Sequence, residues 1–216
     1  IYSKNRLLTT IAYRINGKTT YAMEGSIFIA GAGVQWLRDR MKFFKKAPET
    51  EKIVKSLKDN NNIYLVPAFT GLGAPYWDAN ARGVLSGITR DTSPKEIVRA
   101  TIEAVAYQTY DLFEAMKHDG LRPKIVKVDG GMVMNNWFSQ FLSDIVNVKV
   151  LRPKVQETTA LGAAFMAGLQ IGVYKSLKDI SKNWHLDKKF SPKMKNSLRN
   201  KLLKGWSVAI KKTLSN

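Results

Sequence analysis

The chain has 216 residues, 44% of them hydrophobic, no cysteine and a formal net charge of +18 at pH 7. This length suits one sizeable domain with a helical appendage, and the lack of cysteine excludes disulfide bonds and thiolate metal sites. No apolar run approaches the length that crosses a bilayer, so we expect a soluble cytoplasmic protein with no membrane partner. The sequence begins at Ile1 and not at methionine, which indicates a fragment or a processed chain.

The positive charge raises the question of a nucleic-acid partner, because basic surfaces attract phosphate groups. The lysines are scattered along the chain, for example at Lys42, Lys178 and Lys212, and no recognition helix, zinc finger or pair of stacking aromatic residues accompanies them. We interpret the charge as a solvated surface and expect no nucleic-acid partner. A basic binder of nucleic acids or membrane surfaces stays open as an alternative.

Residues 6–24 form two alternating segments on either side of Asn16-Gly17, a dipeptide typical of type I′ turns, which predicts a β-hairpin. With the lysine and threonine that follow, the turn resembles the end of a Walker A phosphate loop. That loop requires another glycine five residues before Gly17, where Ala12 stands, and it requires a helix where a strand is predicted. The hairpin interpretation is therefore preferred.

Residues 25–44 carry apolar side chains at helical spacing, which predicts a helix. Gly31 and Gly33 inside this helix each cost about 1 kcal/mol relative to alanine, so we expect something to approach it closely. Gly31 and Gln35 are four residues apart and share one face, where a bare patch beside an amide suits a planar heterocycle. Tight packing against a neighbouring helix is the alternative, and spacing alone does not decide between the two.

Residues 45–62 predict a short helix followed by a surface loop, and residues 63–68 and 84–88 predict strands joined by a long ordered loop. A capping box with proline at the first helical position opens a helix over residues 93–117. Glu103 on this helix is a lone carboxylate, for which we expect a surface or packing role.

Residues 125–141 organise the rest of the chain. Their β-branched start predicts a buried strand, and the glycine pair Gly130-Gly131 and a run with helical spacing follow it. Ligands bind at the carboxyl ends of strands in open α/β sheets, and glycines let a flat ligand approach the backbone. Asn135 lies near the start of the helix, within reach of the same ligand. A plain strand-to-helix turn that requires a glycine is the alternative.

Three further elements complete the chain. A strand is predicted over residues 148–151, ended by Arg152 and the proline after it, and a helix rich in small residues is predicted over residues 158–172. A basic amphipathic helix begins after Pro192. We expect it to dock on the domain because Trp206 requires burial, and binding to an acidic partner or a membrane surface is the alternative.

Several long segments carry a family resemblance. They are YAMEGSIFIAGAGVQWLRD, VPAFTGLGAPYWD, RGVLSGITRDTSPKEIVRATIEAVAYQT, VDGGMVMNNWFSQFLSDI and RPKVQETTALGAAFMAGL, and together they cover most of residues 21–172. They resemble the carboxyl-terminal half of glycerol kinases of the FGGY carbohydrate kinase family. The resemblance implies an incomplete α/β, actin-like ATPase domain of the ribonuclease-H-like type. We expect residues 1–180 to form its nucleotide side, without the opening strand, and residues 181–216 to form a helical extension packed on it.

The resemblance also implies a reaction and a site. Glycerol kinases convert ATP and glycerol to ADP and glycerol 3-phosphate, with Mg²⁺ held mainly by the phosphates and by the amino-terminal domain. Nucleotide contacts are implied for Gly31, Gln35, Gly131 and Asn135, the positions already selected for a missing Cβ or an amide. Glycerol binding and the catalytic aspartate belong to the amino-terminal domain. We therefore predict no catalytic residue here and expect the chain alone to be inactive.

Other functions stay open at this point. The chain could be a stand-alone adenine-nucleotide-binding module, or the basic binder of nucleic acid or membrane surfaces described above. The sequence does not fix the oligomeric state, and a homo-oligomer is among the options.

Overall fold

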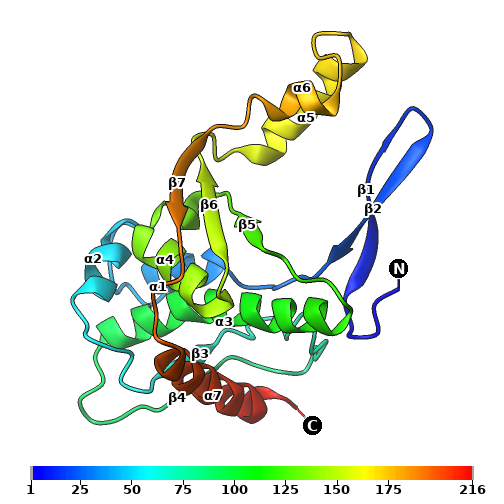
Figure 1. Cartoon of the computed structure of the whole chain (residues 1–216). Helices are drawn as coiled ribbons and strands as arrows, with labels where there is room; N and C mark the ends of the chain where they lie inside the picture. Colours follow the sequence, from blue (N-terminus) through cyan, green and yellow to red (C-terminus); the bar gives the residue numbers. More distant parts are fainter. Residues whose placement is uncertain (1, 216) are drawn as a thin grey trace.

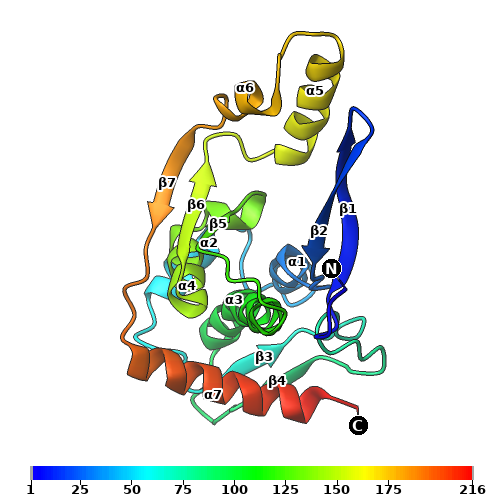
Figure 2. The same cartoon turned by 45° about the vertical axis from the view of Figure 1, so that its right-hand side comes forward.

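The computed structural model describes residues 2–215, which form a body around one long helix and two projections. The long helix is α3 (Pro94–His118), and α4 (Asn136–Val146), α7 (Asn196–Thr213) and the strand β3 (Tyr64–Val66) surround it (Figure 1). A β-hairpin and a helical segment project from the body toward the top of both views (Figure 2). The buried apolar residues lie mainly where α3, α4, α7 and β3 meet.

The predicted hairpin is confirmed. It consists of β1 (Leu8–Ile15) and β2 (Lys18–Glu24), which pair antiparallel. Asn16 has φ 50° and Gly17 has φ 76°, and positive φ at both central residues is what a type I′ turn requires. A strand follows the lysine, so the segment is not a phosphate loop of the Walker type.

The helix predicted over residues 25–44 is too long. Helix α1 covers Gly31–Asp39, and Gly31 is its first residue rather than an interior one. Before it, Ser26 accepts a backbone hydrogen bond from Ala74 at 3.0 Å, so this stretch pairs with a distant loop and not with its own next turn. After it, Lys42 has φ 59°, a left-handed conformation in which a helix cannot continue.

The next elements match the predictions in type and are shorter. Helix α2 covers Glu49–Lys55, and β3 pairs antiparallel with β4 (Val84–Ser86). The predicted capping box is confirmed, since the side chain of Ser93 caps the start of α3 and Glu96 accepts from the Ser93 N–H at 2.9 Å. Asn60, in the predicted surface loop, is only 5% exposed, so that part of the prediction is wrong.

Glu103 has a packing role and not a surface role, because its side chain is fully buried. Its carboxylate accepts from Arg99 Nε at 2.7 Å, from the Tyr107 hydroxyl at 2.9 Å and from Asn60 Nδ2 at 3.3 Å. Arg99 and Tyr107 lie one helical turn away on either side, but Asn60 is 43 residues distant in the chain. Folding therefore supplies a partner that sequence spacing did not show.

A three-stranded sheet carries the glycine pair. Its order is β5-β6-β7, with β5 (Ile125–Lys127) parallel to β6 (Lys149–Pro153) and β6 antiparallel to β7 (Leu186–Phe190). The prediction of a buried strand at β5 is wrong for this chain, because β5 pairs only with β6 among the described strands and Ile125 is 52% exposed. Arg152 does not end β6, since pairing with β7 continues through it with a local irregularity.

The remaining helices complete the two ends of the chain. A 3₁₀ turn, η1 (Gly131–Met134), leads into α4, and α5 (Thr158–Gln170) and α6 (Leu177–Ser181) form the helical projection. Helix α7 lies against the body, because Trp206 is 2% exposed and stacks on Tyr107 with ring centroids 5.2 Å apart. The division at residue 180 stays a prediction. No helix of the described chain is long and apolar enough for a membrane span.

Candidate functional site

A cavity of about 370 Å³ opens between α1, α2 and the η1–α4 segment. All four residues predicted to bind a nucleotide line it, and two residues of α2 join them. These are Gly31 and Gln35 of α1, Thr50 and Glu51 of α2, Gly131 of η1 and Asn135 at the start of α4. Helix α5 contributes no residue to its wall, so its small residues do not form part of this cavity.

Neither backbone conformation nor packing within the chain requires glycine at the two glycine positions of the cavity wall. Neither Gly31 nor Gly131 has a positive φ, and a Cβ on either would meet no heavy atom within 4 Å. Gly33 differs, because its Cβ would lie 2.9 Å from Thr101 Cγ2, so tight helix packing explains that glycine. Gly130 has φ 81° and makes the turn. The bare backbone at Gly31 and Gly131 therefore faces open space, which a planar ligand can occupy.

Asn135 presents a fixed hydrogen-bond donor. Its Oδ1 accepts from the Phe138 N–H at 3.0 Å and so caps the start of α4. Because the oxygen is used in this way, Nδ2 must point toward α2, where it donates to Thr50 Oγ1 at 3.4 Å. An amide nitrogen carries two N–H groups, so one donor stays available to the cavity.

Gln35 on the opposite wall is free. Its exposed side-chain amide makes no hydrogen bond with any residue between 2 and 215. An unpaired amide can turn to offer either a donor or an acceptor. Arg38, one turn further along α1, is instead paired with Asp39 at 2.7 Å.

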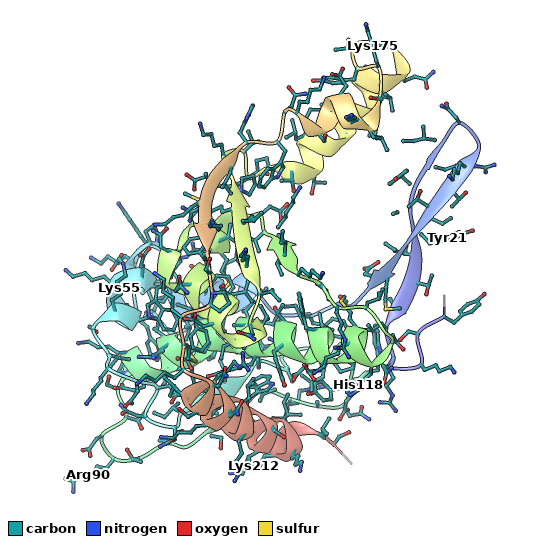
Figure 3. All side chains as sticks on the ribbon, in the orientation of Figure 1. Tyr21, Lys55, Arg90, His118, Lys175 and Lys212 are labelled. Carbon is teal, nitrogen blue, oxygen red and sulfur yellow. The ribbon has the colours of Figure 1, made fainter. Side chains whose placement is uncertain are left out.

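Helix α2 supplies the third wall. Thr50 is 4% exposed and donates to the carbonyl of Ala47 at 2.7 Å, which leaves its lone pairs for Asn135. Glu51 accepts from the Asn136 N–H at 3.2 Å and from Lys55 Nζ at 2.5 Å. Burial raises the pKa of Glu51, but hydrogen bonds from Lys55 and Asn136 outweigh burial and hold this pKa below its usual value. Figure 3 shows Lys55 on the solvent side of α2.

A buried arginine anchors the glycine-rich wall from behind. Arg152 of β6 is 5% exposed and donates through Nη1 to the carbonyl of Val133 at 2.8 Å. The Ser139 hydroxyl donates to the same carbonyl at 2.9 Å. These bonds fix η1 to the sheet and to α4. The sequence did not predict these roles. Arg152 was interpreted as the end of a strand, and Thr50 and Glu51 were interpreted as part of a charged surface segment.

The described residues provide no metal centre of their own. Between residues 2 and 215, no three histidine, cysteine, aspartate or glutamate side chains gather as a metal site would require. The cavity offers bare backbone, amides, one hydroxyl, one carboxylate and the Arg38 guanidinium, and its described residues form no set of ligands for Mg²⁺.

Known proteins resemble this chain in sequence and in fold. Residues 4–171 match the FGGY family of carbohydrate kinases, C-terminal domain, a range well over half of the chain. The chain belongs to the FGGY family of carbohydrate kinases. Glycerol kinase 1 of Pseudomonas aeruginosa is 56% identical over 215 residues, a match that covers 100% of this chain and 44% of that protein. Glycerol kinase of Ectopseudomonas mendocina is 55% identical over 216 residues, covering 100% and 44%.

A solved structure of the same FGGY family agrees. The crystal structure of Plasmodium falciparum glycerol kinase with ADP has a TM-score of 0.89 and 38% identity, and covers 100% of this chain and 44% of that one. The predicted α/β, actin-like, ribonuclease-H-like fold class and the resemblance to the carboxyl-terminal half of glycerol kinases are confirmed. The chain spans less than half the length of the curated relatives it matches.

Proposed function

We propose that this chain is the nucleotide-holding, carboxyl-terminal part of a glycerol kinase. The complete enzyme would transfer the γ-phosphoryl group of ATP to glycerol and release ADP and glycerol 3-phosphate. The observation that carries the proposal is the pair of glycines on the cavity wall, Gly31 and Gly131, which neither backbone conformation nor packing requires. Similarity to glycerol kinases along the whole chain supports the choice of acceptor.

The proposed roles follow from the chemistry of each group. Gly31 and Gly131 leave room for the flat base of the nucleotide between their walls. Asn135 donates a hydrogen bond from a fixed position, and Gln35 adapts its free amide to the ligand. Packing a rigid aromatic base between bare backbone surfaces excludes water and strengthens both hydrogen bonds.

We place the chemical step outside these residues. Phosphoryl transfer requires positioned reactants, charge stabilisation and a base for the acceptor hydroxyl. No described residue is assigned as catalytic. We expect glycerol to bind to the remaining part of the kinase and Mg²⁺ to be coordinated by the phosphates of the nucleotide. Because the reaction uses ATP, we propose a cytoplasmic location. We also retain the division into residues 1–180 and 181–216 as a proposal.

Calorimetric titration of the 216-residue chain with ADP tests the function. We expect weak, saturable, one-to-one binding that ATP competes away, and no glycerol 3-phosphate from ATP, Mg²⁺ and glycerol with this chain alone. If the folded chain does not bind ADP, the proposed site is wrong. Turnover by the chain alone would overturn the placement of the chemistry. Titration with duplex DNA at several salt concentrations is the counter-test, since tight and steeply salt-dependent binding without a response to ADP indicates a nucleic-acid binder.

A further inference from the structure

We propose that Glu51 is a specificity-determining residue that selects an amine-bearing base, adenine, over a base with a carbonyl at the same edge. The inference rests on the proposed function, because it specifies which nucleotide base the cavity accepts. It adds a residue of α2 to the walls formed by α1 and α4.

Glu51 is the only carboxylate among the described residues that line the cavity. The rest of the wall is mainly apolar or bare backbone, with the amides of Gln35 and Asn135 and the Thr50 hydroxyl as its neutral polar groups. Arg38 is the other ionised side chain of the wall, but its guanidinium is paired with Asp39 at 2.7 Å, so Glu51 supplies the charged acceptor of the cavity. Because the Glu51 carboxylate can only accept hydrogen bonds, the edge of a base that faces it must carry a donor.

The position of Glu51 is fixed. One oxygen accepts from the Asn136 N–H at 3.2 Å, at the first turn of α4, where the helix dipole favours a negative charge. The other oxygen accepts from Lys55 Nζ at 2.5 Å. Two carboxylate oxygens accept about four hydrogen bonds in all, so the group keeps acceptor capacity after these two contacts. It has no donor to offer.

A fixed acceptor discriminates in a way that the free amide does not. The Gln35 amide can turn, so it satisfies either a donor or an acceptor on the base. Asn135 is held with its Nδ2 donor toward the cavity, because its oxygen caps α4. An exocyclic amine donates to the Glu51 carboxylate, whereas a carbonyl in its place puts two acceptors together and leaves both unpaired. Sites built to bond a polar group reject analogues that lack it.

The test compares ADP with inosine diphosphate, which carries a carbonyl where adenine carries its amine. We expect the chain to bind ADP about tenfold or more tightly than inosine diphosphate, since hydrogen bonds to charged groups are the stronger class. In Glu51→Gln the ratio should fall to within about threefold, because glutamine offers either polarity. Glu49→Gln is the matched control, since it makes the same charge change on the same helix at a residue outside the cavity wall, and it should keep the wild-type ratio.

Purine riboside diphosphate, which has hydrogen in place of the amine, gives a second measurement on the unaltered chain. It should bind about tenfold more weakly than ADP. The proposal for Glu51 is overturned if Glu51→Gln keeps the preference for ADP, or if removing the amine leaves affinity unchanged. Failure of the folded wild-type chain to bind ADP at all would instead refute the proposed function, so the two failures are distinct.

Discussion

The buried face of α3 and the cavity beside α1 use their polar groups in opposite ways. On α3, the carboxylate of Glu103 is fully buried and accepts hydrogen bonds from three side chains. In the cavity, the Gln35 amide has no partner among residues 2–215, and two glycines face open space. Satisfied groups hold a fold together, and unsatisfied accessible groups are available to a ligand. Substitutions in the two regions should therefore separate stability from binding.

The largest effect on stability is expected for Glu103→Ala. It leaves the guanidinium of Arg99, which is 8% exposed, without its carboxylate partner. Removing one partner of a buried ion pair costs about 3–5 kcal/mol in the free energy of unfolding. Denaturant unfolding at pH 7 measures this loss. Glu114→Ala on the same helix is the control, because its ion pair with Lys117 is solvent-accessible, and it should cost less than about 1 kcal/mol.

Asp111 should make stability depend on pH. Burial raises the pKa of its carboxyl to about 6, and hydrogen bonds from Trp206 and Tyr76 oppose this rise only in part. Between about pH 4 and pH 6 the folded chain then holds more protons than the unfolded chain. The contribution to stability is therefore complete below about pH 4 and is lost as pH rises through 6.

The substitution Asp111→Asn tests this dependence, because an amide oxygen can still accept from Trp206 and Tyr76 but carries no titratable proton. The variant should gain about 1–2 kcal/mol relative to the wild type between pH 5 and pH 8. Exposed Asp91→Asn, measured in parallel by denaturant unfolding, should show no such gain. Parallel pH profiles for wild type and Asp111→Asn would contradict the account.

The smallest effect is expected for Gln35→Ala. Since its exposed amide makes no hydrogen bond within the described fold, the free energy of unfolding should change by less than about 0.5 kcal/mol. Affinity for ADP should fall about threefold to tenfold, the value of one hydrogen bond. Gln170→Ala at the end of α5 should change neither quantity, because it lies outside the cavity wall. A large loss of stability in Gln35→Ala would contradict the claim that the cavity residues act in binding and not in stability.

Local signals predicted most of the fold. The Asn16-Gly17 turn and the capping box before α3 act through neighbouring residues, so the sequence shows them directly. Helix α1 was overextended because the Ser26–Ala74 hydrogen bond and the left-handed Lys42 are set by tertiary structure. Strand β7, with the sequence LDKKF, alternates too weakly to be recognised without β6 beside it.

The site was predictable only where a single sequence position carries the signal. Missing Cβ atoms and amides can be read from single positions, and the four chosen residues do line one cavity, although their nucleotide role stays a prediction. The contribution of α2 could not be read, because the contact of Asn135 with Thr50 joins residues 85 positions apart. Arg152 gave no signal, since its main partners, the Val133 carbonyl and the Asp187 carboxylate, lie 19 and 35 residues away in the chain.

The most direct measurement of the central claim is the ADP affinity of three glycine variants. Gly31→Val and Gly131→Val should each weaken ADP binding at least about tenfold, equivalent to 1.4 kcal/mol, with unchanged circular dichroism. Gly162→Val in α5 is the control, because its Cβ would also meet no heavy atom within 4 Å but lies away from the cavity wall, and its ADP affinity should match the wild type. Unchanged ADP affinity in folded Gly31→Val and Gly131→Val would contradict the account.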